Sequence, residues 1–286
     1  MAEPAFSGSL VAIVTPFRDG QVDLDAFTAL VEWQIENGTS GIVVAGTTGE
    51  AATLQPGERE QLCRRALQVA EKRCPVIMGT GTNATWSSVQ FTRDAVSWGV
   101  DGLLVVTPYY NKPTQAGLLA HFEEVARSAA GVPVIAYDVP GRTGVTFEET
   151  TVHRLAEIDG IVALKDATHD VERAARLAKD TPLTILSGDD ALTLEFMKGG
   201  AAGVVSVVAN IVPDRMAQLC ADRDAATHER LQPLFRASMI ETNPLPTKYA
   251  LAQMGKIQNE LRLPLVPLSR ESEPAVLDAL RSAGAL

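Results

Sequence analysis

The chain of 286 residues has few cysteines, few aromatic residues and no long hydrophobic run. Its three cysteines, Cys63, Cys74 and Cys220, are odd in number, lie far apart and form no CxxC pair. This argues against a disulfide framework and against a zinc knuckle, and we expect reduced thiols. No apolar run approaches the ~20 residues that a membrane span needs. The N-terminal sequence MAEPAFSGSL lacks the features of a signal peptide, so we expect a cytoplasmic protein.

Nucleic-acid and nucleotide binding also lack support in the sequence. The formal net charge is −10, whereas nucleic-acid-binding proteins present a basic patch. Gly79-Thr80-Gly81 lacks the third glycine of a GxGxxG turn, and no GxxxxGK[ST] loop occurs. The four histidines have no metal-ligand spacing, and no cluster of carboxylates suggests a hard metal ion. We therefore expect no metal and no nucleic-acid partner.

The chain does contain a regular alternation of strand-like and helix-like segments. Eight short apolar runs predict buried strands: Leu10–Val14, Gly41–Ala45, Pro75–Gly79, Gly102–Thr107, Val132–Tyr137, Ile161–Lys165, Leu183–Ser187 and Gly203–Val207. Segments with helical spacing lie between them, most of them ending at a glycine. Eight such units predict an α/β fold, the (β/α)8 TIM barrel. The alternative is a doubly wound sheet, which would normally have a glycine-rich turn after its first strand.

Beyond about residue 212 the strand pattern stops, and the remaining sequence predicts helices only. The expected helices are Pro213–Cys220, Thr227–Ile240, Thr247–Leu261 and Glu273–Ala283. We therefore expect a barrel over residues 1–222 with the active site, and a helical C-terminal extension over residues 223–286.

Lys165 stands at the end of the sixth predicted strand, after an apolar run. Desolvating an ammonium is unfavourable, and a lysine that loses its proton becomes a nucleophile toward ketones and aldehydes. The alternative is a lysine at a strand end that extends its ammonium into water. Because side chains alternate along a strand, Asp166 is expected on the opposite face and not as the partner of Lys165.

Other polar residues follow the ends of the remaining predicted strands, where the active sites of such barrels lie. They are Thr47, Thr48, Tyr109, Tyr110, Tyr137 and Arg142. Taken singly, each has an ordinary structural interpretation as a turn cap, an interface aromatic, a core tyrosine or a surface charge. Together they predict a site in which hydroxyl and backbone N–H groups hold a small carboxylate and Arg142 binds a substrate carboxylate. Adjacent tyrosines cannot both point into it.

Five motifs in this order resemble those of the dihydrodipicolinate synthase family: GTTGE at 46–50, TPYYNKP at 107–113, YDVPGRTG at 137–144, LKDAT at 164–168 and LSGDD at 186–190. The family belongs to the pyruvate-dependent class I aldolase superfamily, with N-acetylneuraminate lyase. The resemblance extends from SLVAIVTPF to NPLPTKYAL at 243–251. It implies a lyase that condenses pyruvate with L-aspartate 4-semialdehyde to 4-hydroxy-tetrahydrodipicolinate. This reaction is the first committed step of diaminopimelate and lysine biosynthesis, and it requires no metal or organic cofactor.

The resemblance also implies four catalytic residues. Lys165 would form a Schiff base with pyruvate, and Tyr137 would act as the general acid and base. Thr47 would connect Tyr137 to Tyr110 in a proton relay. Tyr110 would come from a neighbouring subunit of a homotetramer built from tight dimers.

Four further residues are implied to bind substrates. Thr48 would hold the carboxylate of pyruvate, and Arg142 would orient the carboxylate of L-aspartate 4-semialdehyde. Gly188 and Val205 match pocket positions. Asp138 stands where many relatives have asparagine.

Other functions stay open at this point. An aldolase for 2-keto-3-deoxy acids or for 4-hydroxy-2-oxoglutarate would share the lysine, the tyrosine and the GTTGE loop, although Arg142 and the TPYYN pair favour the synthase. A sialic-acid lyase would usually have serine in place of Thr47. A non-catalytic pyruvate-binding homologue would be expected to have lost one of the four catalytic residues, and all four are present.

The resemblance further predicts weak or absent feedback inhibition by L-lysine. Relatives that lysine inhibits often have a histidine early in the helix after GTTGE and a glutamate near the start of the next helix. The matching stretches here contain Pro56, Arg59 and Ser87, which lack the imidazole and carboxylate acceptors for an ammonium. Titration with L-lysine should lower the initial rate only weakly or not at all. Half-inhibition below about 1 mM, about −4 kcal/mol of binding, would contradict this.

Overall fold

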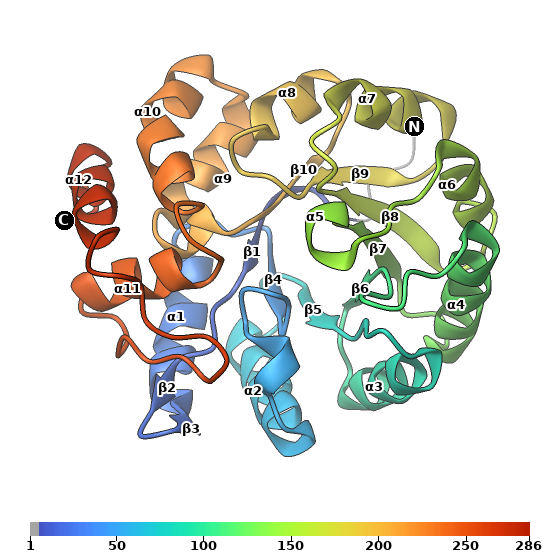
Figure 1. Ribbon diagram of the computed structural model, residues 1–286, viewed down its shortest axis with the longest axis horizontal. Helices are drawn as coiled ribbons and strands as arrows, with labels where there is room; N and C mark the ends of the chain where they lie inside the picture. The colour runs from blue at the N-terminus through green and yellow to red at the C-terminus, as the bar shows by residue number, and fades with distance from the viewer. Residues whose placement is uncertain (1–5) are drawn as a thin grey trace.

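In the computed structural model, which describes residues 6–286, eight parallel strands close into a barrel (Figure 1). The strands are β1 (Gly8–Ala12), β4 (Gly41–Val44), β5 (Val76–Gly79), β6 (Gly102–Val106), β7 (Val134–Asp138), β8 (Ile161–Asp166), β9 (Thr184–Ser187) and β10 (Gly203–Ser206). Neighbours follow the order β1-β10-β9-β8-β7-β6-β5-β4, and β1 also pairs with β4. The predicted TIM barrel is therefore confirmed, and the doubly wound alternative is wrong.

Helices that alternate with the strands surround the barrel (Figure 1). They are α1 (Leu24–Glu36), α2 (Pro56–Ala70), α3 (Thr85–Trp98), α4 (Gln115–Ser128), α6 (Glu149–Leu155), α7 (Val171–Asp180), α8 (Thr193–Lys198) and α9 (Pro213–Asp222). Short elements that the sequence pattern did not predict lie in the connections: β2 (Phe17–Arg18), β3 (Gln21–Val22), η1 (Ala51–Thr53), α5 (Pro140–Thr143) and η2 (Val208–Asn210).

Three further helices complete the chain: α10 (Ala225–Ala237), α11 (Leu245–Gln253) and α12 (Glu273–Ser282). Helix α12 packs against α10 and α11, and α10 packs against α9. The predicted helix over residues 247–261 is wrong in its second half. The chain turns at Gly255, which has φ +72°, and the N–H of Lys256 donates to the carbonyl of Leu251 at 2.9 Å. A glycine in this conformation ends a helix.

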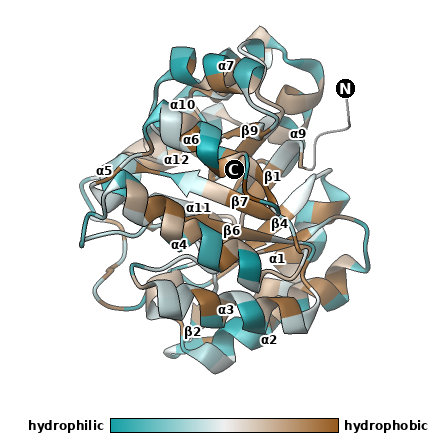
Figure 2. Cartoon of the chain, turned by 90° about the vertical axis from the view of Figure 1, so that its right-hand side faces the viewer, coloured by the Kyte–Doolittle hydropathy of each residue, from teal (hydrophilic) through white to brown (hydrophobic). Residues whose placement is uncertain are grey.

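The alternation of side chains along the strands divides the apolar residues into two cores. Side chains that point into the barrel form an inner core, which includes Leu10, Ile77, Ile135 and Leu186. Those that point outward pack against the helices in a larger outer core. Figure 2 shows the hydrophobic colour concentrated on the strands, while the helices also carry hydrophilic residues. A shift of one residue in any strand would exchange the two sets.

A buried ion pair connects the C-terminal helices to the barrel. The Nζ atom of Lys248 in α11 lies 2.5 Å from Oε1 of Glu50, and both side chains are fully buried. The backbone N–H of Arg262 donates to the other carboxylate oxygen of Glu50 at 3.1 Å, and its guanidinium binds Glu58. Both cations also lie over the ring of Phe17, 4.2 and 4.3 Å from its centroid. The loop after β4 is thus held by groups from the end of the chain.

We expect Lys248→Met to lower the free energy of unfolding by about 3–5 kcal/mol, because the buried carboxylate of Glu50 would lose the ammonium that balances it. Chemical denaturation measures this change. Lys72→Met provides a matched control, since Lys72 forms a 2.7 Å pair with Asp101 at the surface and should contribute at most about 1 kcal/mol. Equal effects of the two substitutions would contradict the prediction.

Candidate active site

Lys165 and Tyr137 face each other inside the barrel. They are register partners on β8 and β7, and the Nζ atom of Lys165 lies 4.0 Å from the centroid of the Tyr137 ring. Lys165 is 6% exposed and Tyr137 is 7% exposed. The predicted buried lysine is therefore present, and little of its side chain is accessible to water. Asp166 points to the outer face, as the alternation predicts.

Burial changes the acidity of both groups. It lowers the pKa of Lys165 to about 7; the nearby charge of Asp190 raises this pKa, and that of Arg142 lowers it. A neutral amine, the nucleophilic form, is therefore well populated near neutral pH. Burial raises the pKa of Tyr137 to about 12, although Arg142 and Thr47 act in the opposite direction. Tyr137 is thus a phenol at neutral pH and can donate its proton.

A cavity of about 440 Å³ opens beside this pair. Four of the residues that the sequence placed at the strand ends line it: Thr47, Tyr109, Tyr137 and Arg142. Lys165 is not part of the cavity wall. It contacts the ring of Tyr137, and Tyr137 is part of that wall. Arg142 lies in α5 with an exposed side chain, at the carboxyl end of β7. Its charge is close enough to change the pKa of both buried groups, so it is positioned to attract an anion toward them.

Thr48 lies next to the cavity-lining Thr47 and is itself buried. Its hydroxyl accepts a hydrogen bond of 2.9 Å from Nδ2 of Asn243, which lines the cavity. Because a hydroxyl that accepts one bond still has its own hydrogen, Thr48 retains a donor. The structure therefore fixes the orientation of this threonine through the C-terminal region.

The neighbouring tyrosines 109 and 110 point to different places. Tyr109 lines the cavity, whereas Tyr110 is 88% exposed. Tyr110 has φ +74°, a strained conformation for a bulky residue, and its N–H donates to the carbonyl of Thr143 at 3.4 Å. Within one chain, Tyr110 is not brought together with Tyr137 and Thr47.

Gly188 and Val205 support the region around Lys165 and do not line the cavity. The N–H of Gly188 donates to the carbonyl of Asp166 at 2.7 Å, and a Cβ atom at this position would lie 2.7 Å from Cβ of Ala167. Only glycine fits here without a shift of the chain. Val205 belongs to the inner core, together with Tyr137.

Three residues near the site were not predicted from the sequence to belong to it. Asp190 accepts hydrogen bonds from Ser206 and from two backbone N–H groups, and its charge raises the pKa of Lys165. Asn243 and the buried guanidinium of Arg59 line the cavity. Asp190 and Asn243 lie within motifs visible in the sequence, but only the folded loops show where their side chains point.

Across residues 6–286, no three histidine, cysteine or acidic side chains are grouped as they would be to hold a metal ion. The same part of the chain has no helix that combines the length and the apolar character of a membrane span.

Comparisons with known proteins identify the family of this chain. The sequence model of the dihydrodipicolinate synthetase family matches residues 5–283. The 4-hydroxy-tetrahydrodipicolinate synthase of Thermodesulfovibrio yellowstonii is 46% identical over 288 residues, which cover 98% of this chain and 99% of the relative.

Two solved structures of dihydrodipicolinate synthases have nearly the same fold. The enzyme from Acinetobacter baumannii, chloride-inhibited and complexed with pyruvate, superposes with a TM-score of 0.96 at 44% identity and covers 98% of this chain and 100% of that chain. The enzyme from Cyanidioschyzon merolae with lysine bound has a TM-score of 0.96 at 36% identity, with 99% and 100% covered.

Proposed function

This chain belongs to the dihydrodipicolinate synthetase family, and we propose that it condenses pyruvate with L-aspartate 4-semialdehyde to give 4-hydroxy-tetrahydrodipicolinate. The observation that supports this most directly is the buried Lys165, whose amine faces the ring of Tyr137 and has its pKa lowered to about 7. A nucleophilic amine beside a proton donor is what the formation of a Schiff base requires.

The first half of the reaction activates pyruvate. The neutral Nζ of Lys165 attacks the ketone carbon, and loss of water gives an imine. Protonation of the imine nitrogen draws electrons from the methyl group, so a methyl proton leaves and an enamine forms. In this mechanism Tyr137, whose ring lies 4.0 Å from Nζ of Lys165, gives the proton that leaves with the water, and its phenolate takes the methyl proton.

The second half joins the two substrates. The enamine carbon attacks the aldehyde of L-aspartate 4-semialdehyde, and the new hydroxyl takes a proton. The amino group of this substrate then displaces Lys165 from the imine carbon, which closes the ring and restores the free lysine. One water is released for each pair of substrates, so the overall reaction balances.

Tyr137 needs a route to exchange its proton with water, because it is buried. Thr47 lies beside it and is exposed, so it is the first member of the proposed relay. We assign the next member to Tyr110 of a second subunit, since the Tyr110 side chain of the same chain extends into solvent. The site is then complete only in a dimer, and we propose a homotetramer built from two such dimers.

The two substrates carry carboxylates, and the chain has a net charge of −10. Local donors must therefore attract them. We assign the carboxylate of pyruvate to Thr48 and nearby backbone N–H groups, and that of the semialdehyde to Arg142 at the cavity. Gly188 and Val205 shape the wall behind Lys165.

The remaining assignments concern the division of the chain and the cellular compartment. We propose that residues 1–222 form the catalytic barrel and that residues 223–286 form an extension that fixes the loop after β4. We also propose the cytoplasm as the compartment, because all three cysteines are buried free thiols.

One experiment with two readouts tests the function. The protein is incubated with pyruvate and borohydride, and the adduct is located by peptide mass spectrometry; in parallel, pyruvate and L-aspartate 4-semialdehyde are assayed for the cyclic product. We expect an adduct on Lys165 together with product. Lys248, the other buried lysine, should remain unmodified because Glu50 holds its ammonium. An adduct without product would favour a sister aldolase, and no adduct on Lys165 would refute the Schiff base.

The pH dependence of this trapping gives a stricter test. Since the pKa of Lys165 is lowered to about 7, the neutral amine forms as the pH rises through this value. The rate of adduct formation should therefore increase with pH and level off above it. A rate still rising tenfold per unit near pH 9 would indicate the ordinary lysine pKa of about 10.4.

Tyr110→Phe should reduce turnover by about 10²- to 10⁴-fold, the range of a general acid–base group, while leaving the fold intact. The reason is that the relay from Tyr137 would lose its final hydroxyl. Steady-state kinetics measure the loss, and Tyr249→Phe in α11 is the control, because its hydroxyl contacts Glu273 at the C-terminal helices. Turnover near that of the wild type in Tyr110→Phe would remove Tyr110 from the mechanism.

A further inference from the structure

A second pair of register partners stands directly behind the proposed catalytic pair. Asp138 follows Tyr137 on β7, Asp166 follows Lys165 on β8, and the two aspartates are paired in the sheet. Because side chains alternate along a strand, both aspartates point out of the barrel. Both are completely buried between the strands and the helices. Two neighbouring carboxylates in such a place repel one another unless a cation balances them.

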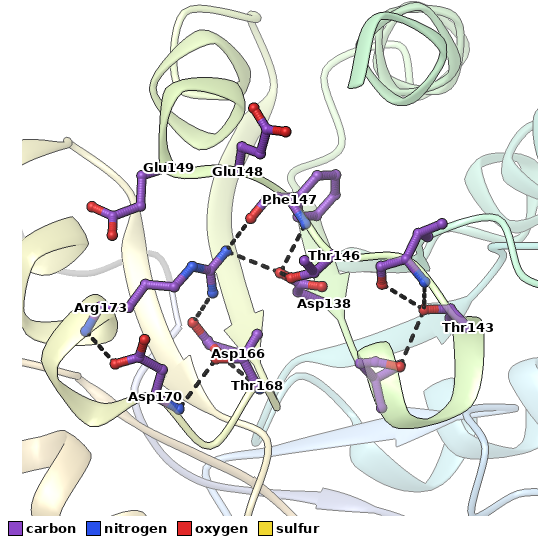
Figure 3. Close-up of polar contacts among 12 residues, drawn as sticks. Asp138, Thr143, Thr146, Phe147, Glu148, Glu149, Asp166, Thr168, Asp170 and Arg173 are labelled. Carbon is purple, nitrogen blue, oxygen red and sulfur yellow. Dashed lines mark hydrogen bonds and ion pairs between the residues drawn. The ribbon is translucent and has the colours of Figure 1, made fainter. Parts of the chain in front are cut away.

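Arg173 of α7 supplies that cation and bridges the two strands (Figure 3). Its Nη2 donates to Oδ2 of Asp138 at 3.0 Å, and its Nη1 donates to Oδ2 of Asp166. Nη2 also donates to the carbonyl of Phe147 at 2.9 Å. The backbone N–H of Arg173 is held in turn by the N-cap residue Asp170 at 2.8 Å. The start of α7 is thereby anchored, and the guanidinium is held between the two strands by its three hydrogen bonds.

The carboxylates also hold the loops that follow the two strands. Oδ1 of Asp166 accepts from the N–H and the hydroxyl of Thr168, at 2.8 and 2.6 Å. Oδ2 of Asp138 accepts from the hydroxyl of Thr146 at 2.9 Å and from the N–H of Phe147 at 3.2 Å. Among the described residues, Oδ1 of Asp138 has no hydrogen-bond partner. The network thus joins the ends of β7 and β8, the loops beyond them and the start of α7.

We propose that Arg173 is a positioning residue for the reaction: by holding Asp138 and Asp166 together behind the barrel wall, it fixes the distance between Tyr137 and Lys165 inside it. This proposal rests on the function proposed above for that pair. Each aspartate is the direct neighbour of a reacting residue, so a shift of either strand end moves the reacting group by a similar amount. Proton transfer is sensitive to such shifts, since a misplacement of about 1 Å can reduce the rate about 100-fold.

A network that served stability alone would behave differently when weakened. Once the variant was folded, its turnover would be that of the wild type, and only its melting temperature would fall. A positioning network instead reduces kcat in the folded protein and changes KM little, because pyruvate still reaches the same groups. The separation of kcat from KM therefore distinguishes the two roles.

Arg173→Lys is the first test, because lysine keeps the charge but cannot bridge two carboxylates with a planar fork. We expect kcat to fall by about 10- to 100-fold and KM for pyruvate to stay within about threefold, with unchanged circular dichroism. The matched control is Arg176→Lys, one turn further along α7, where a half-exposed arginine pairs with Glu149 at 2.7 Å. Its kcat should stay within about twofold of the wild type. Equal kcat values for the two folded variants would overturn the proposal.

A second pair of variants tests the same idea if Arg173→Lys does not fold. Asp138→Asn keeps an oxygen that accepts from Arg173, whereas Asp138→Ala removes the link and leaves Arg173 paired one-to-one with Asp166. We expect kcat within about threefold of the wild type for asparagine and a loss of at least about 10-fold for alanine. The same kcat for both would overturn the proposal. A wild-type protein without product would instead contradict the function proposed for the site.

Discussion

The alternation of side chains along two adjacent strands is the constraint on which this site depends. On β7 and β8 it places Tyr137 and Lys165 inside the barrel and Asp138 and Asp166 outside it. A shift of β8 by one residue would put Asp166 into the barrel and Lys165 into the outer core, and a shift of β7 would exchange Asp138 and Tyr137 in the same way. The register of these two strands changes once, between Val134 and Ile135, and the pairing then runs without interruption to Asp138 and Asp166.

The electrostatics of the site follow from this placement. Inside the barrel, burial opposes the charge on Lys165 and thereby produces a reactive amine, while Asp190 moderates the effect. Outside the barrel, burial raises the pKa of Asp138 to about 6, and the guanidinium of Arg173 counteracts it. Desolvation thus makes Lys165 a better nucleophile inside the barrel. Outside the barrel it opposes the charge of Asp138, and Arg173 of α7 supplies the positive charge that balances it. Arg142 adds positive charge at the cavity of a strongly acidic chain.

The C-terminal helices contribute to the site although they lie outside the barrel. Lys248 and Arg262 hold Glu50, and Asn243 holds Thr48, so the GTTGE loop is fixed by residues that follow it by about 200 positions. A loop at the end of a strand would otherwise be free to move. The extension therefore gives one of the proposed substrate-binding loops a defined shape.

The sequence by itself determined the barrel, the place of Lys165 at the end of a barrel strand and the opposite orientation of Asp166, because these depend on periodicity and on the alternation of strand residues. That Lys165 is buried was decided by the tertiary structure. It did not determine the end of α11 at Gln253 or the short helix that contains Arg142, because these depend on the local backbone. Only the tertiary structure decided that Tyr110 points away from Tyr137 and that Arg173 bridges two strands. Such contacts join residues far apart in the chain, and their geometry arises only when the strands and helices pack together.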